Sequence, residues 1–143
     1  MNLSAPRGTA GLSSALLMLR IASGGFLLPP GLGKLLGWFG GPGLIGFAAE
    51  LQQFGFPSAA PLPLLLALMQ TLSGLAVLLG MTRASAALAA LFIATTVLVA
   101  IPNGWFWMHG GMEYPLMWMV VLLSLAAAGG GDWSRDRLRR RAA

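Results

Sequence analysis

The first long apolar run of the chain, residues 12–38, constrains its fold more than any other segment. It is long enough to cross a bilayer, for which a helix needs about 20 mostly apolar residues. It nevertheless contains Arg20, the pair Pro29-Pro30 and Lys34. A charged side chain at membrane depth costs about 2.5–3.5 kcal/mol, so it is expected to face protein or a wet cavity. The sequence therefore predicts that further helices surround the charged face of this segment.

The composition indicates an integral membrane protein. Of the 143 residues, 57% are hydrophobic and 9% are charged, whereas soluble domains average about 25% charged residues. A soluble domain of this length could not bury so much apolar surface, but lipid can solvate it. We predict a single all-α membrane domain that forms a four-helix bundle. The predicted spans are residues 12–38, 61–80, 84–101 and 114–128, between a polar lead at 1–11 and a basic tail at 129–143.

Two departures from a plain bundle are expected around the first span. Pro29 and Pro30 lack backbone donors, which predicts a kink or break in the helix. Gly33 and Gly37 follow it at a spacing that lets another backbone approach closely. Residues 44–56 have apolar side chains at helical spacing but are too few to cross a bilayer, so we predict a short helix in the membrane interface.

The distribution of basic residues predicts the orientation. The net charge is +5, and five of the nine basic residues lie in the last nine positions. A basic tail after an apolar helix sets topology or contacts anionic lipid more readily than it binds nucleic acid, so no nucleic-acid partner is expected. Four spans place Arg7, Arg83 and the tail arginines on one side. The positive-inside rule then predicts a multi-pass protein of a bacterial inner membrane with both termini in the cytoplasm.

The cysteine and histidine content limits the redox chemistry. The chain has no cysteine and a single histidine, His109. It cannot build a disulfide, a thiolate metal site, an iron–sulfur cluster or bis-histidine haem ligation by itself. We therefore expect no metal site and no intrinsic cofactor, and any redox role requires an electron carrier from elsewhere.

Arg20 and Gln70 are predicted to meet inside the bundle. At about 1.5 Å per residue, Arg20 lies roughly 12 Å from the start of the first span, and Gln70 lies roughly 15 Å from the same membrane boundary in the second. The two spans are antiparallel, so the Gln70 carbonyl can accept a hydrogen bond from the guanidinium. Arg20 is permanently charged, and it needs further acceptors such as helix-break carbonyls near Phe26, water or a bound anion.

A second polar cluster is predicted near the outer mouth of the bundle. Lys34 lies about 21 Å from Arg20 along an unbroken helix, which brings it near Glu50, Glu113 and the loop after residue 103. One interpretation is a structural ion pair between Lys34 and Glu113 or Glu50 that holds the outer loops together.

The other interpretation makes this cluster the polar end of a site for a quinone or a similar amphiphile. Trp105 or Trp107 would then cover the ring, and His109 or Tyr114 would bond a carbonyl oxygen. Tryptophans at a membrane boundary are also expected as an interfacial belt, so their presence alone does not decide between the two interpretations.

Several short motifs share their order and spacing with one family. They are Arg20 followed by Gly33-Lys34-Leu35, Gly55-Phe56-Pro57, Gly74-Leu75 through Leu79-Gly80, Thr82-Arg83, His109-Gly110-Gly111-Met112-Glu113-Tyr114, and the glycine-rich segment 129–136. The chain resembles the DoxX family of small four-helix bacterial membrane proteins. The resemblance implies an oxidoreductase subunit, since members are associated with thiosulfate:quinone oxidoreduction or with thiol and oxidative stress. Many relatives have an acidic residue where this chain has Gln70, so a neutral contact replaces an ion pair.

Two function hypotheses follow. In the first, the chain is a quinone-contacting subunit that works with a partner redox subunit. Arg20 would anchor an anionic or carbonyl group, and Lys34, His109 and Glu113 would shape the entrance. In the second, it is a non-catalytic scaffold or a carrier of lipids or small molecules. The sequence leaves enzymatic activity and homo-oligomerisation open. Under the first hypothesis, replacing Arg20 by alanine abolishes quinone-linked activity while the protein stays in the membrane.

Overall fold

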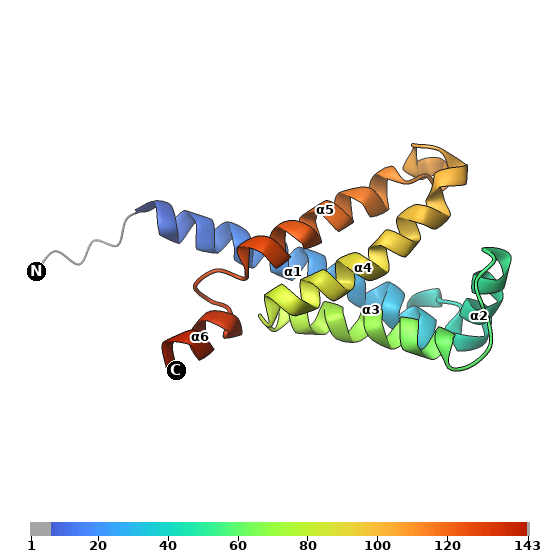
Figure 1. Cartoon of the computed structure of the whole chain (residues 1–143), viewed down its shortest axis with the longest axis horizontal. Coiled ribbons are helices and arrows are strands. Elements are labelled where there is room, and N and C mark those ends of the chain that lie inside the picture. Colours follow the sequence, from blue (N-terminus) through green and yellow to red (C-terminus); the bar gives the residue numbers. More distant parts are fainter. Residues whose placement is uncertain (1–6, 143) are drawn as a thin grey trace, which may run out of the picture.

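The computed structural model describes residues 7–142, and within them every regular element is helical. The four longest helices form the body of the molecule (Figure 1). They are α1 (Arg7–Leu36), α3 (Leu62–Leu78), α4 (Thr82–Ala100) and α5 (Glu113–Ala128). The shorter elements are α2 (Gly43–Gln53), α6 (Arg135–Ala142) and the 3-10 turns η1 (Trp38–Gly40), η2 (Ile101–Asn103) and η3 (Trp107–His109).

The long helices run back and forth along one axis. α1 packs chiefly on α3, α3 also packs on α4, and α4 packs on α5. The start of α1, the turn between α3 and α4, and α6 lie at one end, and α2 and the loop after α4 lie at the other (Figure 1). The α4–α5 pair diverges from the α1–α3 pair toward the end that carries α2 (Figure 1).

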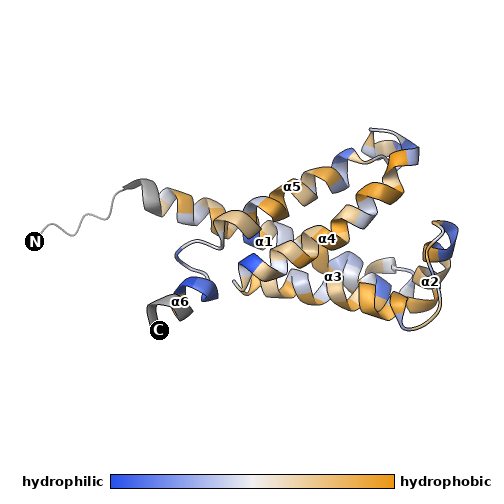
Figure 2. Ribbon diagram, viewed as in Figure 1, coloured by the Kyte–Doolittle hydropathy of each residue, from blue (hydrophilic) through white to orange (hydrophobic). Residues whose placement is uncertain are grey.

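The outer surface of the long helices is apolar. Residues Ala10–Leu36 and Thr82–Asn103 form helices long and apolar enough to cross a membrane, and α3 and α5 are apolar but shorter. Large side chains such as Met18 (70% exposed), Phe26 (63%) and Leu91 (62%) point outward. Figure 2 shows apolar residues along the long helices and hydrophilic residues at the start of α6. A surface of this kind is solvated by lipid rather than by water.

The main core lies between α1, α3, α4 and α5. Val77, Leu122 and Leu125 are fully buried there, next to small residues of α4 such as Ala86 and Ala89. A second cluster of Phe47, Leu51 and Ala67 packs α2 onto α3. α2 is therefore folded over the end of the α1–α3 pair.

Glycines let α1 and α3 approach each other closely. A Cβ added at Gly24 would lie 2.7 Å from the Gly74 carbonyl oxygen and 2.8 Å from the Leu78 nitrogen. A Cβ at Gly31 would lie 2.5 Å from the Thr71 Oγ1. These contacts set the register, in which Gly24 lies beside 74–78 and Gly31 beside Thr71.

Gly33 allows the close backbone approach that was predicted, and the backbone that approaches is that of the following loop. A Cβ at Gly41 would lie 2.3 Å from the Gly33 Cα, so Gly33 makes room for the loop that returns from α1, not for another helix. Gly37 follows α1 with a left-handed φ of 74°, a conformation that glycine adopts without a steric penalty. Both glycines serve the tight connection to α2.

The first helix also differs from its predicted form. It begins at Arg7, inside the predicted polar lead, and residues 1–6 of that lead lie outside the described part. It continues through Pro29 and Pro30 as one helix, so the predicted break is absent and a kink is not confirmed. The prolines leave the carbonyls of Gly25 and Phe26 without their usual donors, and the helix nevertheless persists because α3 packs along it. The bounds of α3, α4 and α5 differ from the predicted spans by at most two residues.

Candidate functional site

The structure separates the two residues that were predicted to pair. Arg20 is 4% exposed. Its Nη1 donates to the carbonyl oxygens of Gly130 (3.0 Å) and Trp133 (3.2 Å), and its Nη2 donates to that of Leu78 (3.4 Å). Gln70 instead accepts a hydrogen bond from Lys34. The predicted Arg20–Gln70 contact is therefore wrong.

The error arises from the register between the two helices. The depth estimate placed the start of the first span and the end of the second span at the same level, but the start of α1 extends beyond the other long helices (Figure 1). The close contact of Gly24 with Gly74 and Leu78 shifts Arg20 to the end of α3 and places Lys34 opposite Gln70. A shift of a few residues is about one or two helical turns, enough to exchange the partners of both cations.

The segment that follows α5 closes the end of the molecule around Arg20. The Asp136 Oδ2 accepts hydrogen bonds from the first two N–H groups of α4, those of Thr82 (2.7 Å) and Arg83 (3.2 Å). The Asp132 carboxylate accepts one from Ser13 of α1 (2.6 Å) and pairs with Arg137 (2.6 Å). The predicted basic tail is thus a structural element, because it supplies the acceptors for Arg20 and the cap of α4.

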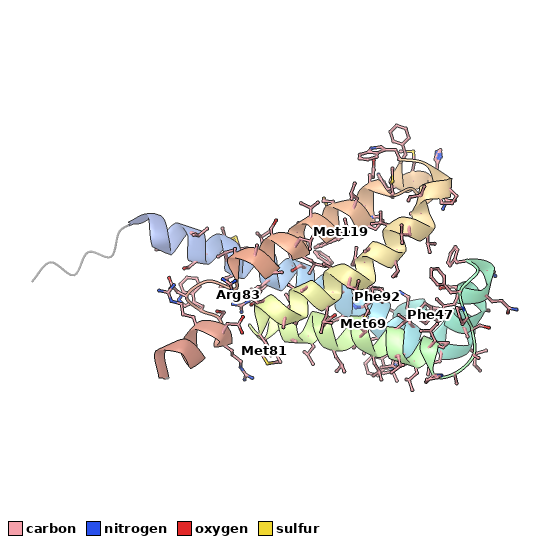
Figure 3. The ribbon with its side chains drawn as sticks, viewed as in Figure 1. Phe47, Met69, Met81, Arg83, Phe92 and Met119 are labelled. Carbon is pink, nitrogen blue, oxygen red and sulfur yellow. The ribbon has the colours of Figure 1, made fainter. Side chains whose placement is uncertain are left out.

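Lys34 lies where α1, α2, α3 and α4 meet. Its Nζ donates to the Gln70 Oε1 at 3.0 Å. The same ammonium is 5.3 Å from the ring centroid of Phe47 on α2 and 5.5 Å from that of Phe92 on α4, within the range of cation–π attraction. Figure 3 labels both rings, which lie more than 40 residues apart in the sequence.

The predicted ion pair of Lys34 is not formed. Neither the Glu50 nor the Glu113 carboxylate comes within 4.0 Å of the ammonium, whereas Arg137 does form an ion pair with Asp132. Glu50 still lines two of the hollows that Lys34 lines, so its charge attracts the ammonium from a longer distance. Gln70 provides the nearest acceptor instead.

Two apolar pockets adjoin the Lys34 ammonium. The first, which we call the Trp118 pocket, has a volume of about 340 Å³ and lies between α1, α3, α4 and α5. Besides Lys34 and Gln70, it is lined by Pro30, Tyr114 and Trp118. Its aromatic wall is organised, because Trp118 contacts the rings of Phe26 (centroids 5.6 Å apart) and Tyr114 (6.1 Å).

The second pocket, which we call the Phe54 pocket, has a volume of about 390 Å³ and is lined by residues of α1, α2, α3 and α4. Phe47, Phe54, Phe56 and Phe92 line it, with Lys34 and Glu50 as its charged groups. Lys34 and Phe92 are common to both pockets, so the same ammonium is presented to each.

The remaining predicted residues lie farther out. Trp105 and Trp107 are 52% and 62% exposed, and His109 is exposed. Trp107 lines a third hollow of about 640 Å³ together with Tyr114, while Glu113 lines neither the Trp118 pocket nor the Phe54 pocket. Of the predicted site, the structure thus brings together Lys34, Gln70, Glu50, Pro30 and Tyr114.

The lining residues that were not predicted as part of the site include the aromatic residues Phe47, Phe92 and Trp118. Phe47 was recognised in the sequence only as part of the apolar face of the short helix. Phe92 and Trp118 stand in apolar runs, where nothing local distinguishes a pocket wall from a residue that faces lipid. The signal that could have found them is their placement at the depth of Lys34, which requires the register of the helices.

The chemistry of this site is that of a hydrogen-bond donor beside apolar space. An ammonium has three donors, and here Gln70 uses one of them. The others can bind a carbonyl or an anionic oxygen, while aromatic walls accept a flat ring. Among residues 7–142 there is no cluster of three or more histidine, aspartate and glutamate residues that could hold a metal ion.

Comparison with known proteins identifies the family. No curated protein and no solved structure matches the chain. The family model of DoxX matches residues 15–110, a range that contains Arg20, Lys34, Gln70 and Phe92 and ends before α5. With two-thirds of its length matched and an apolar helical surface, this chain is a membrane protein that belongs to the DoxX family.

Proposed function

We propose that this protein is a quinone-contacting subunit of an oxidoreductase complex in the bacterial inner membrane. Its four long helices would cross the bilayer as a bundle, with both termini in the cytoplasm. The observation that carries the proposal is the Lys34 ammonium, held by Gln70 at 3.0 Å and open to the Trp118 and Phe54 pockets.

The two pockets match the chemistry of a quinone. A quinone has a flat ring, carbonyl oxygens that accept hydrogen bonds, and a long apolar tail. Lys34 would donate to one carbonyl, the Trp118 or Phe92 ring would pack on the quinone ring, and the tail would leave along the apolar walls toward lipid. Reduction of the ring takes two electrons and two protons. The electrons would come from a partner redox subunit, because the chain has no cysteine and one histidine.

The charge distribution supports the proposed orientation. Arg83, Arg135 and Arg137 belong to the end that also carries the start of α1 and the C-terminal helix (Figure 1). Glu50, Glu113 and His109 belong to elements at the opposite end. The positive-inside rule assigns the arginine-rich end to the cytoplasm.

The Arg20 contacts favour a second candidate function, that of a non-catalytic scaffold or a carrier of apolar small molecules. The guanidinium is bound to three backbone carbonyls of its own chain, so it holds the helices together instead of anchoring a ligand. In this alternative the pockets near Lys34 hold a lipid chain and need no specific contact with its polar end.

Replacing Lys34 by methionine separates the two functions. We expect Lys34→Met to weaken the binding of a short-chain ubiquinone analogue at least tenfold, which corresponds to about 1.4 kcal/mol, because a methionine of similar volume cannot donate to a carbonyl oxygen. The measurement is quenching of tryptophan fluorescence by the quinone in detergent, with Trp118→Phe used to assign the signal. An isoprenoid of equal length without the ring serves as the inert ligand.

The control variant is His109→Ala, which changes an exposed residue outside both pockets and should leave the affinity unchanged. Equal quenching by the quinone and the inert isoprenoid, or an unchanged affinity in Lys34→Met, would refute quinone recognition and favour the carrier.

A further inference from the structure

A polar pocket of about 360 Å³ lies at the arginine-rich end, far from Lys34. We call it the Arg83 pocket. It is lined by Arg83, Ala128, Gly129–Gly131, Ser134, Asp136 and Arg137. Figure 3 shows Arg83 at the start of α4, beside the segment that leads to α6. The pocket thus forms where the apolar α5 ends at Ala128 and the polar tail begins.

The acidic groups near this pocket are already engaged. Asp136 caps α4 through the N–H groups of Thr82 and Arg83, and Asp132 binds Ser13 and Arg137. The Arg83 guanidinium, in contrast, donates to the Ala128 carbonyl oxygen at a long 3.4 Å. Within the described residues no carboxylate oxygen lies within 4.0 Å of it. A guanidinium has five donors, so most of those of Arg83 remain free for a ligand with several oxygens.

The glycine loop leaves the guanidinium accessible. Gly129 has a φ of 83° and packs directly on Arg83, because a Cβ added there would lie 3.2 Å from the Arg83 Nε. No side chain from this position covers the cation. Arg137, whose charge is shared with Asp132, forms the other basic wall.

We propose that the Arg83 pocket binds the phosphate of an anionic phospholipid such as phosphatidylglycerol. Arginine forks bind phosphate oxygens in bidentate geometry, which fits the free donors of Arg83. The proposal is independent of the proposed quinone site, which lies at the other end of the helices.

The position of the pocket favours a lipid over a soluble phosphate. Trp133, which follows the glycine loop, is 58% exposed, and tryptophan is enriched at the lipid headgroup level. Leu88 of α4 and Leu123 of α5 are 50% and 51% exposed, which provides apolar surface for the acyl chains on the two helices that lead to the pocket. Basic residues at such a boundary attract anionic lipid by about 1 kcal/mol each, and the sequence continues with Arg139, Arg140 and Arg141.

The test uses native mass spectrometry of the full-length protein in a neutral detergent, titrated with phosphatidylglycerol or with phosphatidylcholine. We expect the unchanged protein to retain one phosphatidylglycerol at concentrations at which phosphatidylcholine is not retained. Arg83→Gln should weaken this retention at least tenfold, and Arg83→Lys should restore part of it. A second arm adds inorganic phosphate, which should not displace the lipid at millimolar concentration.

Arg135→Gln is the matched control, since it removes the same charge nearby from a residue that does not line the pocket. The affinity of Arg135→Gln for phosphatidylglycerol should stay within twofold of that of the unchanged protein. An equal loss in Arg135→Gln would show that diffuse attraction, and not this pocket, holds the lipid. Displacement by inorganic phosphate would show a site for soluble phosphate. Thermal unfolding verifies that each variant is folded. If Arg83→Gln does not fold, Arg137→Gln replaces it in the test, because Arg137 is the other basic residue that lines the pocket, and it should also weaken the retention of phosphatidylglycerol. Quinone binding near Lys34 should be unaffected in all of them.

Discussion

Replacing Arg20 by alanine is expected to destabilise the whole protein, not to remove an activity from an intact fold. The side chain is 4% exposed and binds the carbonyls of Leu78, Gly130 and Trp133. Each buried carbonyl left without a donor costs about 1–3 kcal/mol. The expected loss is therefore about 3 kcal/mol or more, a large part of the stability of a typical domain.

The measurement is thermal unfolding in mild detergent, together with the yield of monodisperse protein. Arg20→Lys is the matched variant, because it keeps the charge but loses the planar fork that reaches several carbonyls at once. It should fall between the unchanged protein and Arg20→Ala. A stable Arg20→Ala protein that lacks only quinone-linked activity would instead support the role predicted from the sequence, in which Arg20 anchors a ligand.

Replacing Gly24 by alanine is expected to separate α1 from α3. The new Cβ would lie 2.7 Å from the Gly74 oxygen and 2.8 Å from the Leu78 nitrogen, both of which are backbone atoms that cannot rotate away. Forcing the helices apart costs packing along their whole interface, for which we expect about 3 kcal/mol. Arg20 would also move away from the Leu78 carbonyl, since both contacts belong to the same helix pair.

The neighbouring glycine provides the control. A Cβ at Gly25 would meet no atom within 4 Å, so Gly25→Ala should leave stability unchanged or raise it by about 0.5–1 kcal/mol through helix propensity. The two variants add the same methyl group at adjacent positions of α1. Equal unfolding temperatures of the two proteins in the same detergent would contradict the close packing of α1 on α3.

The helices themselves could be predicted because their signals are local. Long apolar runs define the segments, and breakers such as Gly80 and Pro102 end them, so the bounds of α3, α4 and α5 lie within two residues of the predicted spans. The family could be recognised for a related reason, since the motifs around Arg20 and Lys34 are short and keep their order.

The partners of the two buried cations could not be predicted, because they depend on how one helix slides along another. Arg20 and Lys34 each found a different partner than expected once Gly24 and Gly31 had fixed the register. The apolar side chains do not indicate the register between two helices, since a displaced register buries a similar apolar area. The capping of α4 by Asp136 could not be predicted either, because a cap supplied by a residue 54 positions away leaves no local sequence pattern.

The contacts of Arg20 have a consequence for biosynthesis. Its carbonyl acceptors at Gly130 and Trp133 lie 110 and 113 residues farther along the chain. While the ribosome is still making the middle of the protein, this guanidinium has no lasting partners, and it must remain near water or lipid phosphates. The first helix to be synthesised can therefore reach its final position only after the segment that contains Gly130 and Trp133 has been made. A chain truncated before Gly130 would leave Arg20 of the N-terminal helix without two of its carbonyl acceptors.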